Sequence, residues 1–483
     1  MKKFSLIFMM ILVLGLTACG KTTAKQETKQ ETSAEAESST ETEMKNYENA
    51  VKIQLSNSEI LVDSEQISEN TEDAVYKAND IIFYLEDQGI EYGEGTSEDE
   101  HSQIEADAHT VVHITKAGTY EISGILEAGQ IFVDLGEDAK KDPEAVVTLI
   151  LNNADITCTV APAILFYNVY ECAEDVEEEE AVMDVDTTAA GANLVLADGS
   201  TNKVYGSYIA KIYESCELSE DGTEVVDSKK LHKYDGALYS KMSMNVFGDT
   251  GILEINAENE GLDTEKHLTI HGGNIRIKSG NDAINVNEDN ISVFTLNNGT
   301  VDIEITGTTG EGDGIDSNGW LIINGGTLNA YSCATSGDAG IDADKGIDIN
   351  GGTVVATGNM NAELAGGKQV SVSFNSKEKL EGRKTYKVKD EDGNVVMEIL
   401  PFNTFSVLVV SSAELTEDGN YSLWLDDTQI AEGTKATMGV GGPVMGGDKK
   451  PDGEMPHRER PEGMEPPEKS DRQKNKCTIN RNA

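Results

Sequence analysis

The sequence predicts an all-β protein whose core is a right-handed parallel β-helix. Two observations support this prediction: four segments share one pattern, and the glycine that ends each corner recurs at an even spacing. The segments are 268–277, 294–303, 321–330 and 347–356, and the glycines are Gly273, Gly299, Gly326 and Gly352, which lie 26, 27 and 26 residues apart. A period near 26 made of short alternating stretches matches one coil of a β-solenoid and excludes a helical repeat.

Each repeat has the same order of segments. An alternating apolar stretch meets an Asn/Gly corner, where glycine and asparagine accept a positive φ, and a second alternating stretch follows. The inward residues are expected to stack into one apolar column: Ile270, Ile275, Ile277, Leu296, Val301, Ile303, Ile323, Leu328, Ile349 and Val354. Weaker copies at 149–157 and 193–200 extend the β-helix, which is predicted over 111–360.

The remaining segments of the folded part follow from composition. Residues 171–186 are too acidic for a strand and predict an exposed loop inserted between coils. Residues 46–110 are expected to form a lead-in and an N-terminal cap. Alternating strands over 361–430 predict a small β cap that closes the open end of the β-helix. Residues 431–483 are rich in Gly, Pro, Met and charge, which is typical of a disordered tail.

The N-terminus predicts secretion and a lipid anchor. Lys2 and Lys3 precede an apolar run from Phe4 to Leu16, and Leu-Thr-Ala-Cys then ends at Cys19. The run is shorter than the roughly 20 residues of a membrane span, so 1–19 is read as a lipoprotein signal peptide with a lipobox. Residues 20–45 form a flexible polar tether. The protein is therefore expected on the extracellular face of the cell membrane, anchored through lipid on Cys19; a plain signal peptide is the alternative.

Composition argues against some classes of binding partner and against some kinds of metal or redox centre. With 87 acidic and 38 basic residues the net charge is −49, which argues against a nucleic-acid partner. Such a surface either stays soluble by repulsion or collects divalent cations. No CxxC motif is present and the seven histidines are scattered, so a zinc or redox centre is not expected. Cys158 and Cys172 could pair, or could be isolated buried thiols.

A second recurring element places acids next to apolar residues between the corners. One expected column contains Asp235, Glu260, Asp282, Asp313 and Asp338, and a second contains Asp263, Asn285, Asp316 and Asp342. Equivalent residues of adjacent coils lie ~4.8 Å apart. Two carboxylates at that distance repel by roughly 3 kcal/mol at an effective dielectric constant near 20, so cations between them would stabilise the column. Calcium, with 6–8 oxygen ligands, suits it best. Ordinary turns capped by Asp and Asn are the alternative.

Together the lipobox, the glycine corners and the Asp turns resemble the bacterial carbohydrate-binding β-helix lipoproteins. That family is described as binding cellulose and acid sugars, contains calcium and is similar in shape to pectate lyases. Residues 407–424 and 439–447 also resemble it, and the resemblance covers most of 110–447. It implies a surface-anchored, monomeric binding protein for acidic, pectin-like (polygalacturonate-like) or cellulosic polysaccharide. Aromatic side chains that could stack on sugar are Trp320, Tyr239 and Tyr331, although Trp320 could equally pack at a coil edge.

Two other functions remain open at this point. A calcium-dependent polysaccharide lyase of the pectate-lyase type needs a strong base, and the repeat region offers only Lys266, Lys278, Lys345 and Arg276. Because such lysines are more often solvated edge residues, a binding protein without catalytic residues is expected. A structural surface protein or adhesin is the other alternative.

Overall fold

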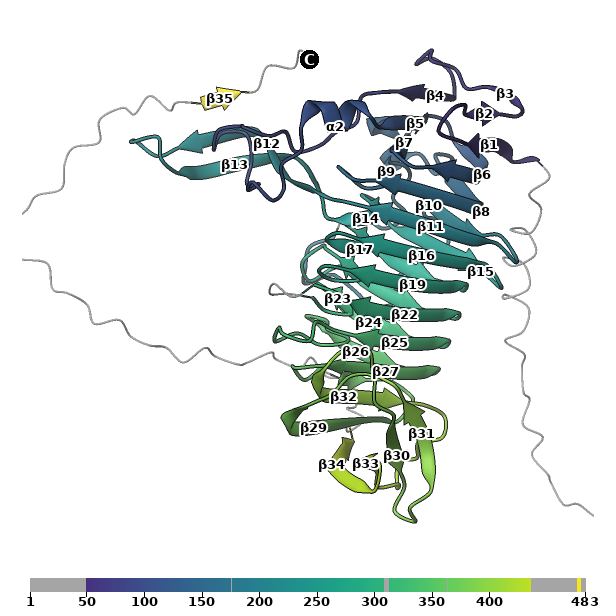
Figure 1. Ribbon diagram of the computed structural model, residues 1–483, viewed down its shortest axis with the longest axis vertical. Helices are drawn as coiled ribbons and strands as arrows, with labels where there is room; N and C mark the ends of the chain where they lie inside the picture. The colour runs from purple at the N-terminus through teal and green to yellow at the C-terminus, as the bar shows by residue number, and fades with distance from the viewer. Residues whose placement is uncertain (1–48, 175, 308–311, 363, 436–475, 479–483) are drawn as a thin grey trace, which may run out of the picture. The chain divides into compact units, whose positions relative to one another are not determined.

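The computed structural model describes residues 49–174, 176–307, 312–362, 364–435 and 476–478 (Figure 1). The fold is all-β as predicted, and helix is limited in the described ranges to short pieces such as α2 (Gln103–Asp107) and the 3-10 turn η2 (Glu137–Lys141). None of these helices is long and apolar enough to cross a membrane. The predicted signal peptide with Cys19, the tether over 20–45 and most of the predicted tail lie outside the described residues.

Two ladders of parallel strands contain the sequence repeat, and their strands follow one another as successive rungs in Figure 1. The first ladder comprises β10 (Ala192–Leu196), β15 (Met244–Gly248), β18 (Leu268–Ile270), β21 (Val293–Leu296), β24 (Trp320–Ile323) and β26 (Gly346–Ile349). The second comprises β11 (Thr201–Gly206), β16 (Ile252–Ala257), β19 (Asn274–Ser279), β22 (Thr300–Ile305), β25 (Thr327–Tyr331) and β27 (Thr353–Gly358).

A third parallel ladder carries the acidic residues. Its strands are β5 (Thr110–Ile114), β7 (Gly129–Asp134), β9 (Ile164–Asn168), β14 (Gly236–Ser240), β17 (Glu260–Thr264), β20 (Ile284–Val286) and β23 (Ile315–Ser317). Strand β4 (Val75–Ala78) adds to β5 in the antiparallel sense. In the repeat region the chain visits the three ladders in turn, as in β17, β18 and β19, so equivalent residues of successive repeats come into register.

The corner and core predictions are confirmed. All ten inward residues named from the sequence are at most 1% exposed. The four corner glycines have φ between 76° and 96°. A Cβ at Gly299 would also lie 2.6 Å from the backbone oxygen of Gly273, so glycine is required there by both conformation and space. Each fully buried isoleucine or leucine contributes about 1.5–3 kcal/mol, and the stacked column therefore stabilises the repeat region.

The N-terminal region joins the same ladders. Strand β1 (Val51–Leu55) pairs in parallel with β6 (Gly118–Leu126), and β6 pairs in parallel with β8 (Val147–Cys158), which leads into β10 and β11. The short strands β2 (Leu61–Val62) and β3 (Glu65–Gln66) extend β1 as an antiparallel edge. Ladder pairing thus begins inside the segment predicted to be a lead-in.

Two insertions interrupt the repeat. The acidic loop exposes Glu177 to Glu180, as expected for residues 171–186. An antiparallel hairpin of β12 (Ile209–Leu218) and β13 (Val225–Tyr234), which the sequence pattern did not reveal, leaves the ladders between β11 and β14, and β35 (Lys476–Thr478) pairs with β12. The described cysteines Cys158, Cys172, Cys216 and Cys333 are free thiols, so Cys158 and Cys172 do not pair.

Antiparallel strands follow β27, the last strand of the second ladder. They are β29 (Ser371–Leu380), β30 (Tyr386–Lys389), β31 (Val395–Ile399), β32 (Phe405–Ser411), β33 (Ser422–Leu425) and β34 (Thr428–Lys435), after the short β28 (Leu364–Gly366). Strand β32 runs antiparallel to β27, and a separate apolar cluster that includes Phe374, Tyr386 and Phe405 forms beneath it. Strand β34 extends to Lys435, past residue 431 where the tail was expected to begin.

Candidate functional site

The second predicted column is in register along the third ladder. Backbone pairing places Tyr239 beside Asp263, Asp263 beside Asn285, and Asn285 beside Asp316. A bridge between Ile315 and Ile341 continues the alignment to Asp342. The sequence alignment of Asp263, Asn285, Asp316 and Asp342 therefore agrees with the strand register.

The first predicted column is in register only in its middle. Glu260, Asp282 and Asp313 each stand two residues before an inward apolar residue, whereas Asp235 and Asp338 stand three before theirs. Gly236, not Asp235, accordingly pairs with Glu260. Because side chains alternate between faces along a strand, this offset changes the direction of Asp235 and Asp338. Their placement in the column was wrong by one residue.

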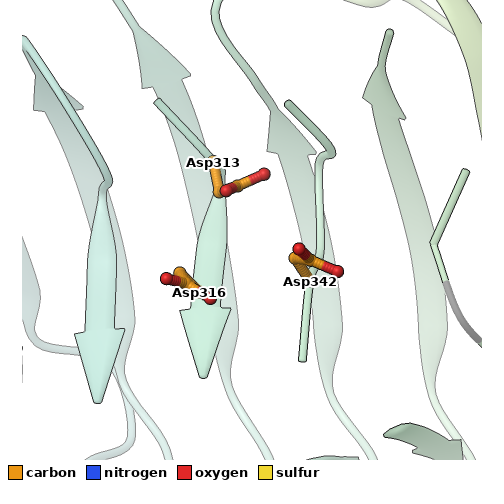
Figure 2. Close-up of side chains that lie close together, drawn as sticks. All are labelled: Asp313, Asp316 and Asp342. Atoms are coloured by element: carbon orange, nitrogen blue, oxygen red, sulfur yellow. The ribbon is translucent and has the colours of Figure 1, made fainter. Parts of the chain in front are cut away.

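Three carboxylates of the predicted columns meet at β23, and we call them the outer triad: Asp313, Asp316 and Asp342. Figure 2 shows Asp313 and Asp316 on one rung and Asp342 on the next. One oxygen from each side chain lies within 4.8 Å of the others, and all three side chains are half-buried. At that distance and an effective dielectric constant near 20, two charged carboxylates repel by roughly 3 kcal/mol.

The environment of the outer triad disfavours negative charge. Burial raises the pKa of Asp313 to about 9, with further contributions from Asp282, Asp342 and Asp316 that outweigh the hydrogen bond from Ala339. Burial and then Asp342 raise the pKa of Asp316 to about 6. A cation among these oxygens would favour their charged forms. The residues present fit calcium, whose flexible coordination accepts carboxylates from neighbouring rungs.

A second pair of acids, the inner pair, consists of Glu260 and Asp263 on β17. They are 6% and 0% exposed, and burial followed by repulsion from neighbouring carboxylates raises both pKa values well above the ordinary range. Asn285 Nδ2 donates to Glu260 Oε1 at 3.2 Å, and Asn287 Nδ2 donates to Asp263 Oδ1 at 2.5 Å. The other oxygens of the pair, Glu260 Oε2 and Asp263 Oδ2, have no hydrogen-bond partner among the described residues.

Three orphaned oxygens therefore come from two adjacent rungs, because Asn285 Oδ1 also lacks a partner within the described part of the chain. Burying an ionised carboxylate without compensation costs several kcal/mol, so the inner pair must hold protons or a cation. Carboxylates and amide oxygens are both ligand types that calcium accepts, so a cation is one way to compensate the inner pair. The role of Asn287 was missed, although it follows Asn285 by only two residues.

The other predicted metal ligands already have partners. Asp235 forms an ion pair with Lys233 at 2.7 Å. Asp282 Oδ1 accepts the backbone N–H of Asp313 at 2.6 Å, and Asp338 Oδ2 accepts that of Gly312 at 2.7 Å. The two hydrogen bonds join neighbouring rungs rather than capping the acid's own turn, so they differ from the local caps of the alternative interpretation.

The aromatic candidates differ in exposure. Trp320 on β24 is half-buried, with the Lys345 ammonium 5.2 Å from its ring centroid. Tyr239 is 2% exposed and donates to Glu265 Oε1 at 2.7 Å, so it has too little free ring to be a stacking platform. Tyr331 packs against the apolar cluster of the C-terminal cap. Trp320 and Tyr331 are thus both half-buried, whereas Tyr239 is enclosed.

The basic residues considered for lyase chemistry are all engaged. Lys266 contacts Glu288 at 2.6 Å, Lys278 contacts Glu304 at 3.0 Å, and Arg276 contacts Glu254 at 3.2 Å. Lys345 Nζ donates to the backbone oxygen of Glu178 in the acidic insertion at 3.3 Å. A base that removes a proton from a sugar must reach it with a free lone pair, and these ammonium and guanidinium groups are held by acceptors.

A polar groove of about 750 Å³ lies along the first ladder, between its outer face and the acidic insertion. Its floor carries hydrogen-bonded asparagines: Asn324 donates to Asn297, and Asn350 donates to Asn324, both at 2.9 Å. Ile322 lines the groove and shares its strand face with Trp320, two residues away. Amides and hydroxyls thus line the groove along successive rungs.

Comparison with known proteins agrees with a glycan-binding class. Residues 108–398 match the family described as carbohydrate-binding domain-containing protein, and the chain belongs to that family. A relative with the same description from Acetivibrio thermocellus is 32% identical over 169 residues, which is 35% of this chain and 45% of the relative. The chain therefore spans less than half the length of that relative.

One solved structure is also similar, and its title reads "Structure of the polysaccharide lyase-like protein from C. thermocellum, Gadolinium derivative". It is 22% identical, and the match covers 62% of this chain and 83% of that one with a TM-score of 0.33.

Proposed function

We propose that the protein binds acidic, uronate-rich polysaccharide through calcium ions held on one face of a right-handed parallel β-helix. Family membership supports a carbohydrate ligand. The observation that carries the proposal is the meeting of Asp313, Asp316 and Asp342 within 4.8 Å on two adjacent rungs. Protons or a cation can relieve the repulsion among three acids so close together, and a cation bound at a partly exposed site can also bind a carboxylate of the ligand.

Calcium explains how an acidic protein can bind an acidic polymer. The chain has a net charge of −49, which alone would repel a uronate polymer. A divalent ion offsets most of the negative charge of the outer triad and leaves coordination positions for sugar oxygens, since calcium accepts 6–8 ligands. Magnesium fits less well because it requires a small, near-ideal octahedron.

Neutral, cellulosic glycan is the second candidate ligand, and the polar groove supports it. Its asparagine amides can donate and accept hydrogen bonds with sugar hydroxyls, while Trp320 offers an apolar ring face beside Ile322. We expect Trp320→Ala to weaken retention on insoluble cellulose and to leave binding of uronate unchanged.

The experiment that tests the proposed function is a pull-down against a panel of polysaccharides with and without a chelator. Retention by polygalacturonate that is clearly stronger in calcium than in chelator is the expected result. Retention that a chelator does not change would remove calcium from the account. Absence of binding to every glycan would favour an adhesin whose ligand is a protein.

We also propose that the protein works outside the cell, as a monomer anchored through lipid on Cys19. The Leu-Thr-Ala-Cys motif behind a short apolar run supports this. Metabolic labelling with a palmitate analogue should mark the wild type and miss Cys19→Ala. Equal labelling of both proteins would contradict the anchor.

A further inference from the structure

A second cavity, of about 650 Å³, differs in charge from the rest of the protein. It lies where β9, β14 and the hairpin strand β13 meet η2 and the segment after β9. Six lysines line this cavity, which we call the lysine pocket: Lys140, Lys141, Lys230, Lys233, Lys241 and Lys266. In a chain of net charge −49, such a concentration of lysines requires an explanation.

Three of the six lysines are neutralised by acids. Lys230 contacts Glu265 at 3.1 Å, and Lys233 and Lys266 form the ion pairs with Asp235 and Glu288 given above. The other three, Lys140, Lys141 and Lys241, form no ion pair with any residue in the described ranges.

The acid nearest in sequence to the pocket wall does not neutralise them. Glu171 uses its carboxylate to accept the N–H and the hydroxyl of Ser243, both at 2.7 Å, and the N–H of Ala173 at 2.9 Å. Glu171 keeps its charge, and Glu174 also lines the pocket, but neither forms an ion pair with the three lysines. The six lysines still outnumber by one the acids that line the pocket or pair with its lysines, and a bound anion would compensate this positive charge.

Of the three lysines without an ion pair, Lys241 is the best placed to bind an anion. Its ammonium lies 4.2 Å from the centroid of the Tyr167 ring, a cation–π contact, and the side chain is half-buried. Burial lowers the pKa of Lys241, against the attraction of Glu265. A partly desolvated ammonium without a carboxylate partner gains more from a charge-assisted hydrogen bond than a solvated one does.

The wall of the pocket is aromatic. Tyr167 and Tyr170 are half-buried and retain free ring surface, and Tyr234 stands edge-on to Tyr167 at 6.3 Å between centroids. Phenol rings beside cations suit a ligand that carries both an apolar face and a carboxylate, and a uronic acid residue has both.

The pocket also stands at the upstream end of the second column. Tyr239 lines it and is in register with Asp263, Asn285 and Asp316. Three rungs separate Tyr239 from Asp316, which corresponds to about 14 Å at the spacing of parallel strands. The lysine pocket and the outer triad thus lie on the same ladder, three rungs apart.

We propose that the lysine pocket binds a carboxylate of an acidic sugar directly, without metal, through Lys241, Lys140 and Lys141, with the sugar ring against Tyr167 and Tyr170. The sugar class rests on the proposed function. The mode of binding does not, because it requires no calcium.

The test is titration of the full chain with trigalacturonic acid in excess chelator, by calorimetry. We expect the wild type to bind and Lys241→Gln to lose roughly tenfold or more in affinity, as expected for loss of a charge-assisted hydrogen bond. Lys241→Arg, which keeps the charge, should stay within a few-fold of the wild type and shows that the site still folds. Lys278→Gln, which lies outside the pocket and is paired with Glu304, should bind as the wild type does.

Several results would overturn the proposal: no binding by the wild type in chelator, unchanged affinity in Lys241→Gln, or equal affinity for cellotriose or inorganic phosphate. The calcium site is scored separately by adding calcium to the same samples. If calcium adds no affinity while binding in chelator remains, the outer triad does not bind uronate through calcium, and direct binding by the lysine pocket is supported. If only calcium-dependent binding is seen, the proposal of metal-free binding in the lysine pocket is contradicted, while the proposed function is supported.

Discussion

The inner pair and the outer triad are made of the same residue types on the same ladder, yet their surroundings differ. Glu260 and Asp263 are almost fully enclosed, and each has one oxygen without a partner in the described structure. Asp313, Asp316 and Asp342 are half-buried and lie two and three rungs further along the ladder, beyond β20. The pair is thus closed to a ligand, whereas the triad is open to one.

This difference separates two uses of one ion. A cation at the inner pair would compensate buried charge and stabilise the fold, since the alternative is a protonated or unpaired acid. A cation at the outer triad would still have open coordination positions and could bridge to sugar. Changes at the pair should therefore affect melting, and changes at the triad should affect binding.

The largest effect is expected at the outer triad. Asp313→Asn with Asp316→Asn keeps the turn conformations and removes charge, because Asn accepts the same backbone geometry. We expect calcium-dependent affinity for trigalacturonic acid to fall roughly 100-fold, equivalent to about 2.7 kcal/mol, while the protein stays folded. If the acids serve only as turn residues, the variant should bind as before and melt at the same or a higher temperature.

The inner pair should give a smaller effect and in a different measurement. Glu260→Gln with Asp263→Asn keeps the oxygens that Asn285 and Asn287 donate to, and removes the buried charge. In chelator this variant should be more stable than the wild type by on the order of 2 kcal/mol, and calcium should stabilise it less. Thermal melts with and without calcium measure both. A variant that melts lower than the wild type in chelator would contradict the account of the pair.

The pH dependence of the metal-free protein follows from the outer triad. The pKa of Asp316 is raised from 3.8 to about 6 and that of Asp313 from 3.8 to about 9, in each case mainly by burial. The folded state therefore holds protons that the unfolded chain has already released, and stability falls as pH rises from about 4 through 6 toward 9. Melts in chelator across this range should show the fall, and saturating calcium should flatten it. A free energy of unfolding that rises over the same pH range would contradict the raised pKa values of Asp313 and Asp316.

The smallest effect is expected at the paired lysines. Lys266→Ala and Lys345→Ala remove side chains held by Glu288 and by the backbone of Glu178. Uronate affinity should change less than about threefold, because Lys266, although it lines the lysine pocket, is neutralised by Glu288, and Lys345 lies outside the pocket. No unsaturated product should appear in the ultraviolet with the wild type or with either variant. Steady product formation by the wild type, lost in one variant, would make the protein a lyase.

The parts of the fold that repeat locally could be predicted from the sequence. Gly273 and Ile270, with their equivalents, recur at one period, and a period specifies both the corner and the inward face. The column error had a local cause as well, since Asp235 and Asp338 lie one residue further from the strand than Glu260 does. Because the residue patterns of these turns look alike, the sequence hid this offset of one residue, which changes the direction of the side chain.

The lysine pocket could not be predicted, because no repeat links its parts. Lys140, Tyr167, Lys230 and Lys241 come from separate segments, and the hairpin β12–β13 that brings Lys230 to the pocket has no equivalent in the other coils. The burial of Tyr239 was also hidden, since it depends on Glu265 and on neighbouring coils rather than on its own segment. Contacts across such insertions appear only in three dimensions.

The most direct test of the central claim is calorimetric titration of the full chain with calcium. The account predicts that the wild type binds calcium, that the double change at Asp313 and Asp316 removes the outer-triad ion, and that calcium-dependent uronate binding is lost with it. A wild type that binds no calcium, or a variant that loses calcium but binds polygalacturonate in calcium as the wild type does, would contradict the claim.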